Sequence, residues 1–512
     1  MKRIAPWICL VLALAGCSLR HASRAGSTTL QVALSLAPDK LDPTFAGTAC
    51  GRTIFTAMCQ KLYDLNSKDV VVPQLAAGLP RITDHGLTYT IEVRRGARFS
   101  DGTPLNAAAV KTSIDHYRNT TGSSRAAELL LVKSVTVTAP YEVQIRLKSP
   151  YPALATILAD RSGMVLSPKR LAKLGVNFGQ DPSCVAPFKV HSRPSANEID
   201  LEKDPDYYDA NDVKLQKIVY KVISDPNVAL ANLRSGATDV AEISPVVAST
   251  IHKHSVRVLS TVGLGDVHLT INTGNVHGSD APKGTVRTPL GADPRVRRAL
   301  ALAIDRNQLV HIAFGGLYAA NCSPIPRTSP YSTPAIRKCP PADPAKARAL
   351  LKQAGAKTPY PVELKITTLA LDQRVGQVLQ PMLAKAGFKL TLRSEDQTTV
   401  VADQDAGNFQ ASISDWSGRL DPDTNFQQLV GPTNSGGFAD KQVTRLMSDA
   451  RQTTDVTARG RIYAKVMSRI DELVPSIVLA QIAETAVART GVSGVHIFND
   501  GLIRVDGASI TG

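Results

Sequence analysis

The sequence predicts a mixed α/β fold of several lobes, and two kinds of pattern carry this prediction. Residues 87–93 alternate strictly between apolar and polar side chains, which is typical of a half-buried strand. Residues 134–138 and 142–147 alternate again on either side of a short turn and favour a hairpin. Asp-Pro pairs at 293–294 and 343–344 indicate helix starts, because aspartate caps a helix and proline fits its first turn.

Length and composition are those of a multidomain globular protein. The chain has 512 residues, of which 43% are apolar and 20% charged, so wholesale disorder and fibrous architectures are excluded. At about 100–200 residues per domain, it has room for two to four domains. The net charge of +15 is spread along the chain without long basic clusters, so we expect no nucleic-acid partner.

The N-terminus predicts export. Lys2 and Arg3 precede an apolar run over residues 4–15, which is too short to span a bilayer and fits a secretory signal peptide. The string Leu-Ala-Gly-Cys at 14–17 resembles the bacterial lipoprotein box, which implies that Cys17 becomes a lipid-modified N-terminus. We therefore expect a signal peptide over 1–16, a lipidated tether over 17–27 and an extracytoplasmic protein anchored to the cell membrane.

Five cysteines remain after the signal peptide and the lipidated position. Cys50 and Cys59 are close in sequence, as are Cys322 and Cys339, so two local disulfides are expected and Cys184 is left unpaired. The sequence does not fix this connectivity. No C-x-x-C motif occurs and no histidine pair lies near a cysteine, so we expect no metal site.

Motifs for catalysis are missing from the sequence. It contains no phosphate-binding G-x-x-x-x-G-K-[ST] loop, no H-E-x-x-H and no G-x-S-x-G. Asp421 and Asp423 have the spacing of a carboxylate pair for acid–base work, but the D-P-D-T-N setting is equally a turn-forming loop. These observations favour a binding protein that uses no cofactor.

Several strings, in order, resemble one protein family. Residues 84–110 follow a D-G, strand, R-x-G-x-x-F-x-D-G-x-P-[LF]-x-A-x-x-V signature. Four other segments match in the expected order, at residues 41–43, 204–208, 235–239 and 293–306. The chain resembles the family 5 extracellular solute-binding proteins of ABC importers, which include oligopeptide-, dipeptide- and nickel-binding receptors.

This resemblance implies a periplasmic-binding-protein-like clamp of type II, cluster C-like, with two α/β lobes and an extra domain on the first lobe. The ligand is expected in the cleft between the lobes, which close around it on a hinge. The expected division is lobe I over 28–57, 165–265 and 478–512, the extra domain over 58–164, and lobe II over 266–477.

The function implied is that of a membrane-tethered receptor, a monomer, that delivers its solute to the permease and ATPase subunits of an importer. A peptide is the expected ligand, with a sugar, a metal chelate or an anion as non-peptide alternatives. A different class of function, an exported enzyme on the same clamp, is the less favoured hypothesis.

One departure from the family bears on the ligand. Peptide-binding members carry an aspartate three residues after a tryptophan, where it receives the α-amino group; here that position, after Trp416, is Arg419. A guanidinium repels an ammonium in a partly dry cleft. Either Asp415, Asp421 or Asp423 takes over amine binding, or the ligand offers an anion or hydroxyl groups. A third alternative is that Arg419 points away from the ligand.

Overall fold

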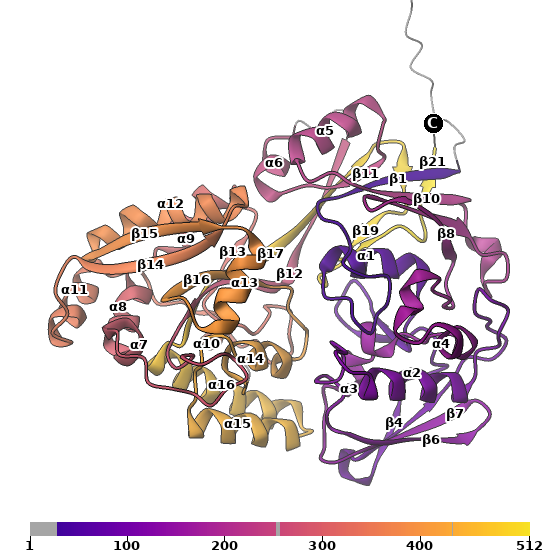
Figure 1. Cartoon of the computed structure of the whole chain (residues 1–512), viewed down its shortest axis with the longest axis horizontal. Helices are drawn as coiled ribbons and strands as arrows, with labels where there is room; N and C mark the ends of the chain where they lie inside the picture. Colours follow the sequence, from indigo (N-terminus) through magenta and orange to yellow (C-terminus); the bar gives the residue numbers. More distant parts are fainter. Residues whose placement is uncertain (1–27, 252–255, 433, 512) are drawn as a thin grey trace, which may run out of the picture.

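Two α/β bodies lie side by side and are joined by a pair of long strands (Figure 1). The computed structural model describes residues 28–251, 256–432 and 434–511. The expected signal peptide over 1–16 and the tether over 17–27, including Cys17, lie outside the described residues. The first body contains the N-terminal half of the chain and the C-terminal segment, and the second contains the chain between them.

A single sheet of eleven strands runs through both bodies. Its order is β15-β14-β16-β12-β17-β11-β1-β10-β9-β8, with β13 paired to β17. In the first body β1 pairs in parallel with both β10 and β11, and in the second β14 pairs in parallel with β15 and β16. The strands are β1 (Thr29–Leu34), β8 (Phe188–Ser195), β9 (Glu198–Lys203), β10 (Lys217–Val222), β11 (Val240–Glu242), β12 (Val256–Ile271), β13 (Ala319–Ala320), β14 (Tyr360–Thr367), β15 (Phe388–Glu395), β16 (Ala411–Trp416) and β17 (Ser476–Arg489).

The two long strands, β12 and β17, form the connection between the bodies. They pair antiparallel, from Val256 opposite Arg489 to Thr270 opposite Ser476, and the register shifts between Val262 and Asp266. Gly263 and Gly265 lie inside this irregular segment. A Cβ at Gly265 would come within 2.2 Å of the carbonyl oxygen of Trp416, so only glycine allows β16 to approach here.

The first body also holds a four-stranded antiparallel sheet, in the order β4-β5-β7-β6. β5 (Thr88–Glu92) confirms the predicted strand, and β6 (Val132–Ala139) and β7 (Glu142–Leu147) confirm the predicted hairpin. One apolar core is continuous from this sheet to the large one. The other elements here are β2 (Tyr63–Leu65), β3 (Val71–Pro73), β4 (Arg81–Thr83), α1 (Ala49–Met58), α2 (Ala107–Asn119), α3 (Leu154–Ile157), α4 (Pro168–Leu174), α5 (Pro226–Ser235), α6 (Pro245–Ser249), β18 (Val492–Ser493), β19 (His496–Ile497), β20 (Ile503–Arg504) and β21 (Ser509–Ile510).

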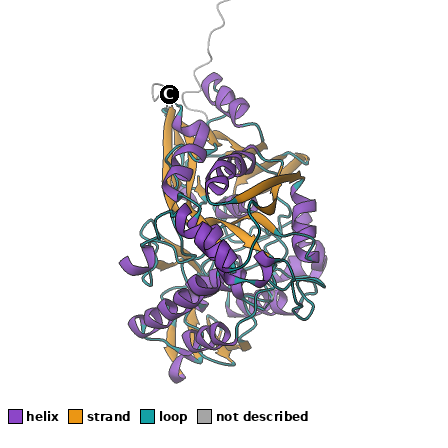
Figure 2. Cartoon of the chain, turned by 90° about the vertical axis from the view of Figure 1, so that its left-hand side faces the viewer, coloured by secondary structure: helices purple, strands orange, loops and turns teal. Residues whose placement is uncertain are grey.

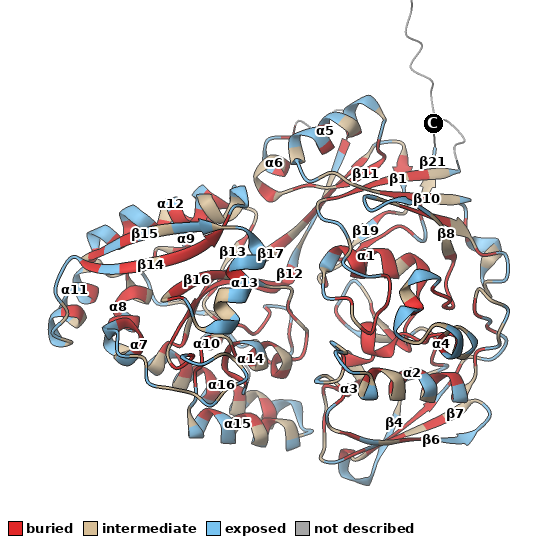
Figure 3. Ribbon diagram, viewed as in Figure 1, coloured by how far each residue is buried: buried red, intermediate tan, exposed pale blue. Residues whose placement is uncertain are grey.

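Helices cover the sheet of the second body (Figure 2). Both predicted starts are confirmed, because Asp293 accepts a 2.8 Å hydrogen bond from the backbone N–H of Arg295 and Asp343 accepts one of 2.8 Å from that of Lys346. The helices are α7 (Pro289–Ala292), α8 (Pro294–Leu302), α9 (Arg306–Ala313), α10 (Pro334–Arg337), α11 (Pro344–Gln353), α12 (Ala370–Lys385), α13 (Gln397–Ala406), α14 (Pro422–Val430), α15 (Lys441–Gln452) and α16 (Val456–Leu473). Buried residues follow the strands that meet at the junction of the bodies (Figure 3).

The disulfide pattern differs in part from the expectation. Cys322 and Cys339 are bonded as predicted, but Cys59 is bonded to Cys184, and Cys50 is a buried free thiol. Cys50 and Cys59 lie at opposite ends of helix α1. At 1.5 Å rise per residue their Cα atoms are roughly 13 Å apart, about twice the span of a disulfide. The predicted Cys50–Cys59 bond is therefore wrong, and so is a free Cys184.

Candidate functional site

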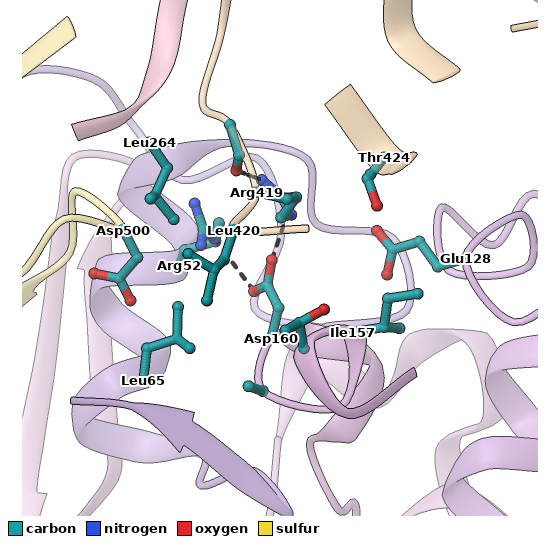
Figure 4. A pocket seen from close by; sticks show the side chains of 13 residues that line it. Arg52, Leu65, Glu128, Ile157, Asp160, Leu264, Arg419, Leu420, Thr424 and Asp500 are labelled. Atoms are coloured by element: carbon teal, nitrogen blue, oxygen red, sulfur yellow. Dashed lines mark hydrogen bonds and ion pairs between the residues drawn. The ribbon is translucent and has the colours of Figure 1, made fainter. Parts of the chain in front are cut away.

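A small cavity lies where the two bodies meet (Figure 4). Its volume is about 30 Å³, so the bodies are almost in contact around it. Arg52, Glu128 and Asp160 line it from the first body and Arg419 and Leu420 from the second. Leu420 packs into the apolar core of the first body, so the chain after β16 reaches across the junction.

An ion pair spans this junction. The Nη2 atom of Arg419 lies 3.2 Å from Oδ2 of Asp160, and the other oxygen of Asp160 accepts a 3.2 Å hydrogen bond from Nε of Arg52. Nε of Arg161 is 3.6 Å from the same oxygen. Burial favours the neutral acid, but the guanidinium groups of Arg52, Arg161 and Arg419 outweigh it and hold the pKa of Asp160 well below its usual range. Asp160 is therefore a buried anion shared by three arginines.

Trp416 and Arg419 are positioned by one residue that sequence analysis missed, Asn425. Its Oδ1 accepts hydrogen bonds of 2.8 Å from the indole Nε1 of Trp416 and from the backbone N–H of Arg419. The Arg419 guanidinium carbon lies 5.1 Å from the centre of the Trp416 ring, a cation–π contact. Asn425 is buried near the start of α14. The Asp-Pro helix start at 421–422 is the only sequence signal for its place.

Asp421 is paired within the second body, whereas Asp423 contacts side chains of both bodies. Asp421 caps α14 and forms a bidentate ion pair with Arg459, with N–O distances of 2.5 and 2.9 Å. Asp423 accepts a 2.8 Å hydrogen bond from Nε of Arg451, and its other oxygen lies 3.5 Å from the hydroxyl of Tyr151 in the first body. Both carboxylates are buried, and in this conformation Asp421 has no oxygen free for a ligand amine.

Asp415 is the most accessible of the five predicted residues. It lies near the end of β16 and lines a wider cavity of about 340 Å³ together with His268, Asp372 and Gln404. Its side chain is exposed to the cavity, while the protein crowded around it raises its pKa. The structure thus brings Trp416 and Arg419 together at the junction and leaves Asp415 facing a separate hollow.

A pair of acids on the other side of Arg52 was also missed. Glu242, from β11, and Glu484, from β17, line a third cavity of about 30 Å³ together with Arg52 and Asp500. Burial, and then the charge of Glu242, raise the pKa of Glu484 to about 7. The thiol of Cys50 donates to Glu242 at 3.5 Å. The junction therefore has an arginine-rich side and an acidic side, with Arg52 between them.

A charged junction between two α/β bodies on paired strands is the architecture expected of a solute-binding clamp. Residues 70–437 match the model of the bacterial extracellular solute-binding proteins, family 5. The chain belongs to this family. It is accordingly an extracytoplasmic receptor that binds a solute for an ABC importer and works with the importer's permease, and it is not an enzyme.

Similar proteins agree with this assignment over almost the whole chain. The glutathione-binding protein GsiB of Salmonella choleraesuis is 27% identical over 491 residues, which cover 92% of each chain. The Agrobacterium protein AgaA, solved with agropinic acid, superposes with a TM-score of 0.81 at 26% identity and covers 94% of this chain and 99% of its own. NikZ of Campylobacter jejuni, solved with Ni(L-His), has a TM-score of 0.82 at 21% identity over 94% and 99% of the two chains, a likeness of fold.

Within residues 28–251, 256–432 and 434–511, no helix has the length and apolar character needed to cross a bilayer. In the same ranges, no three histidine, cysteine or acidic side chains are grouped as metal ligands would be.

Proposed function

We propose that this protein is a monomeric, lipid-anchored receptor that closes around a short peptide or peptide-like acid and presents it to a permease driven by ATPase subunits. The observation that carries the proposal is the junction itself, where Arg419 and Leu420 of one body meet Asp160 and the core of the other. A site built from both bodies binds its ligand best when they are closed, so ligand and closure are thermodynamically linked.

The division into moving parts follows from the paired strands. We propose lobe I over 28–57, 165–265 and 478–512, an extra domain over 58–164 and lobe II over 266–477, with the hinge in β12 and β17. The register shift between Val262 and Asp266 supports a hinge here, because it interrupts regular pairing between the two bodies.

Trp416, Arg419 and Asp415 are the proposed ligand contacts. Trp416 and Arg419 form one stacked unit at the junction, and Asp415 lines the separate cavity of about 340 Å³. The names of the relatives, a glutathione-binding protein and a protein solved with agropinic acid, support ligands that combine peptide-like and acidic groups. Anchoring through Cys17 is supported by the lipoprotein-box resemblance of residues 14–17.

The test begins with the solute that the protein carries. Protein purified from membranes without denaturation is extracted, the extract is analysed by mass spectrometry, and each solute found is added back to stripped protein. We expect at least one solute to reduce the radius of gyration in solution scattering and to shift the emission of Trp416. That residue is the only tryptophan after the predicted signal peptide. Trp416→Phe is the control for the optical signal. Absence of any carried solute, together with no closure, contradicts the receptor proposal.

A further inference from the structure

Three arginines share one acid on the arginine-rich side of the junction. The guanidinium groups of Arg52, Arg161 and Arg419 lie within 3.6 Å of a single carboxylate, Asp160. Among these four contacting groups, three positive charges face one negative charge. Arginines gathered around a single acid in a buried place repel each other, and burial with this repulsion lowers the pKa of Arg161 to about 9.

The neighbouring acids offset this imbalance only in part, because each has a closer partner of its own: Asp500 acts on Arg52, and Glu128 acts on Arg419. Glu128, which also lines the cavity, is paired with Arg125 at 2.5 Å. Asp500 is paired with Arg504 at 2.7 Å. Glu242 and Glu484 lie on the far side of Arg52 and line a different cavity with it. Glu484 interacts electrostatically with Arg52, but neither acid is paired with Arg419.

Two of the arginine nitrogens also lack hydrogen-bond partners among the described residues. Nη1 of Arg52 is buried without a hydrogen-bond partner, and Nε of Arg161 has only its 3.6 Å ion-pair contact with Asp160; the two side chains are 5% and 3% exposed. Arg52 lines the cavity that Arg419 enters from the other body. A buried, unpaired guanidinium N–H is costly, so it marks a place where an acceptor is missing.

We propose that Arg52 and Arg419, supported by the charge of Arg161, form a subsite for a carboxylate of the transported solute. Asp160 occupies this position in the closed structure and competes with the ligand for Arg419. The planar guanidinium groups suit a carboxylate, which each can bind through two parallel hydrogen bonds. Since Arg52 belongs to the first body and Arg419 to the second, a bound carboxylate bridges them and favours closure. This inference rests on the proposed receptor function and specifies its ligand as an acid.

The test uses three pairs of probes of nearly equal size in which each carboxylate is replaced by a neutral amide: glutathione, γ-glutamylglutamate and glutarate, each compared with its fully amidated form. Binding to stripped, full-length protein is measured by calorimetry. We expect at least one acid to bind about tenfold or more tightly than its amide. Arg52→Gln and Arg419→Gln should abolish this preference. Arg295→Gln is the control, because Arg295 is exposed and paired only with groups of the second body, Asp293 and Gln353.

Asp160→Asn gives the opposite sign and separates this inference from loss of folding. Removing the competing carboxylate should tighten binding of the acid about tenfold, which a merely damaged site does not do. Equal binding of acid and amide, preference for the amides, or no binding of any probe by folded protein overturns the carboxylate subsite. The receptor proposal survives each of these results if a solute carried from the cell still closes the clamp, and it fails if none does.

Discussion

The Asp421–Arg459 ion pair is expected to stabilise the second body rather than to bind ligand, and Asp421→Asn tests this. The Arg459 side chain is fully buried and that of Asp421 is 6% exposed. Asparagine keeps the size and the helix cap of Asp421 but removes its charge, which leaves Arg459 buried without a counter-ion. Breaking a buried pair in this way costs about 3–5 kcal/mol. We expect the free energy of unfolding to fall by that amount.

The matched control is Asp440→Asn. Asp440 also caps a helix, α15, and pairs with Arg469 at 2.9 Å, but Arg469 is 26% exposed. Asparagine again keeps the cap, and loss of such a surface pair costs about 0–1 kcal/mol. Urea unfolding followed by circular dichroism and by Trp416 emission measures both variants. The reasoning is refuted if Asp421→Asn unfolds like the control while solute binding is lost, because Asp421 would then be a ligand contact.

Four further predictions follow from the same structure. Burial raises the pKa of Glu484 to about 7, so the folded protein favours the protonated acid and its stability should fall as pH rises from about 4.5 through 7. Glu484→Gln should flatten this pH dependence and add at most about 3 kcal/mol of stability at pH 8. Glu472→Gln, at an exposed position, is the control in the same series of thermal melts. Cys59→Ser removes a disulfide between residues separated by 125 positions and should lower the free energy of unfolding by about 4–5 kcal/mol in the chain-entropy model. Thiol counting on denatured, unreduced protein that lacks residues 1–17 should find one free thiol, and five free thiols would contradict both disulfides. Arg419→Asp should strengthen the binding of ligands with an amine and weaken the binding of acidic ligands by about 1–3 kcal/mol, as measured by calorimetry. Unchanged affinities, together with Trp416 emission that does not respond to ligand, would show that this segment is not part of the site. Cys17→Ala should release or misprocess the protein in membrane fractionation, and a variant that stays bound and correctly cleaved would exclude the lipid anchor.

Local features were predictable because their causes lie within a few residues. Asp293 and Asp343 cap their helices through backbone N–H groups two and three residues away, and the strand over 88–92 is visible as alternation. The family assignment, and with it the clamp, came from the order of several such segments. Motif comparison also singled out Trp416 and Arg419, which lie together at the junction.

Long-range pairings were not predictable from local pattern. Arg52 meets Asp160 across 108 positions, and nothing in the sequence around either residue indicates the other. The Cys59–Cys184 disulfide is equally long-range and has no local signal. Proximity in sequence favoured Cys50 as the partner of Cys59, but the two residues lie at opposite ends of helix α1. Asp421 was predicted as a ligand contact because local sequence does not reveal its partner, Arg459, which lies on a distant helix, α16.

The paired strands between the bodies have a consequence for how this chain can be altered. Val262 of β12 lies opposite Ala483 of β17, so the segment between them leaves the first body and returns to it at neighbouring positions in one sheet. A segment whose two ends are adjacent behaves as an insertion, and such units tolerate exchange because both connections to the host lie side by side. We therefore expect that the second body can be exchanged between relatives as one unit. Such an exchange transfers Trp416 and Arg419 and leaves Arg52 and Asp160 in the first body. Exchange of this kind recombines the two halves of a binding site in a single step.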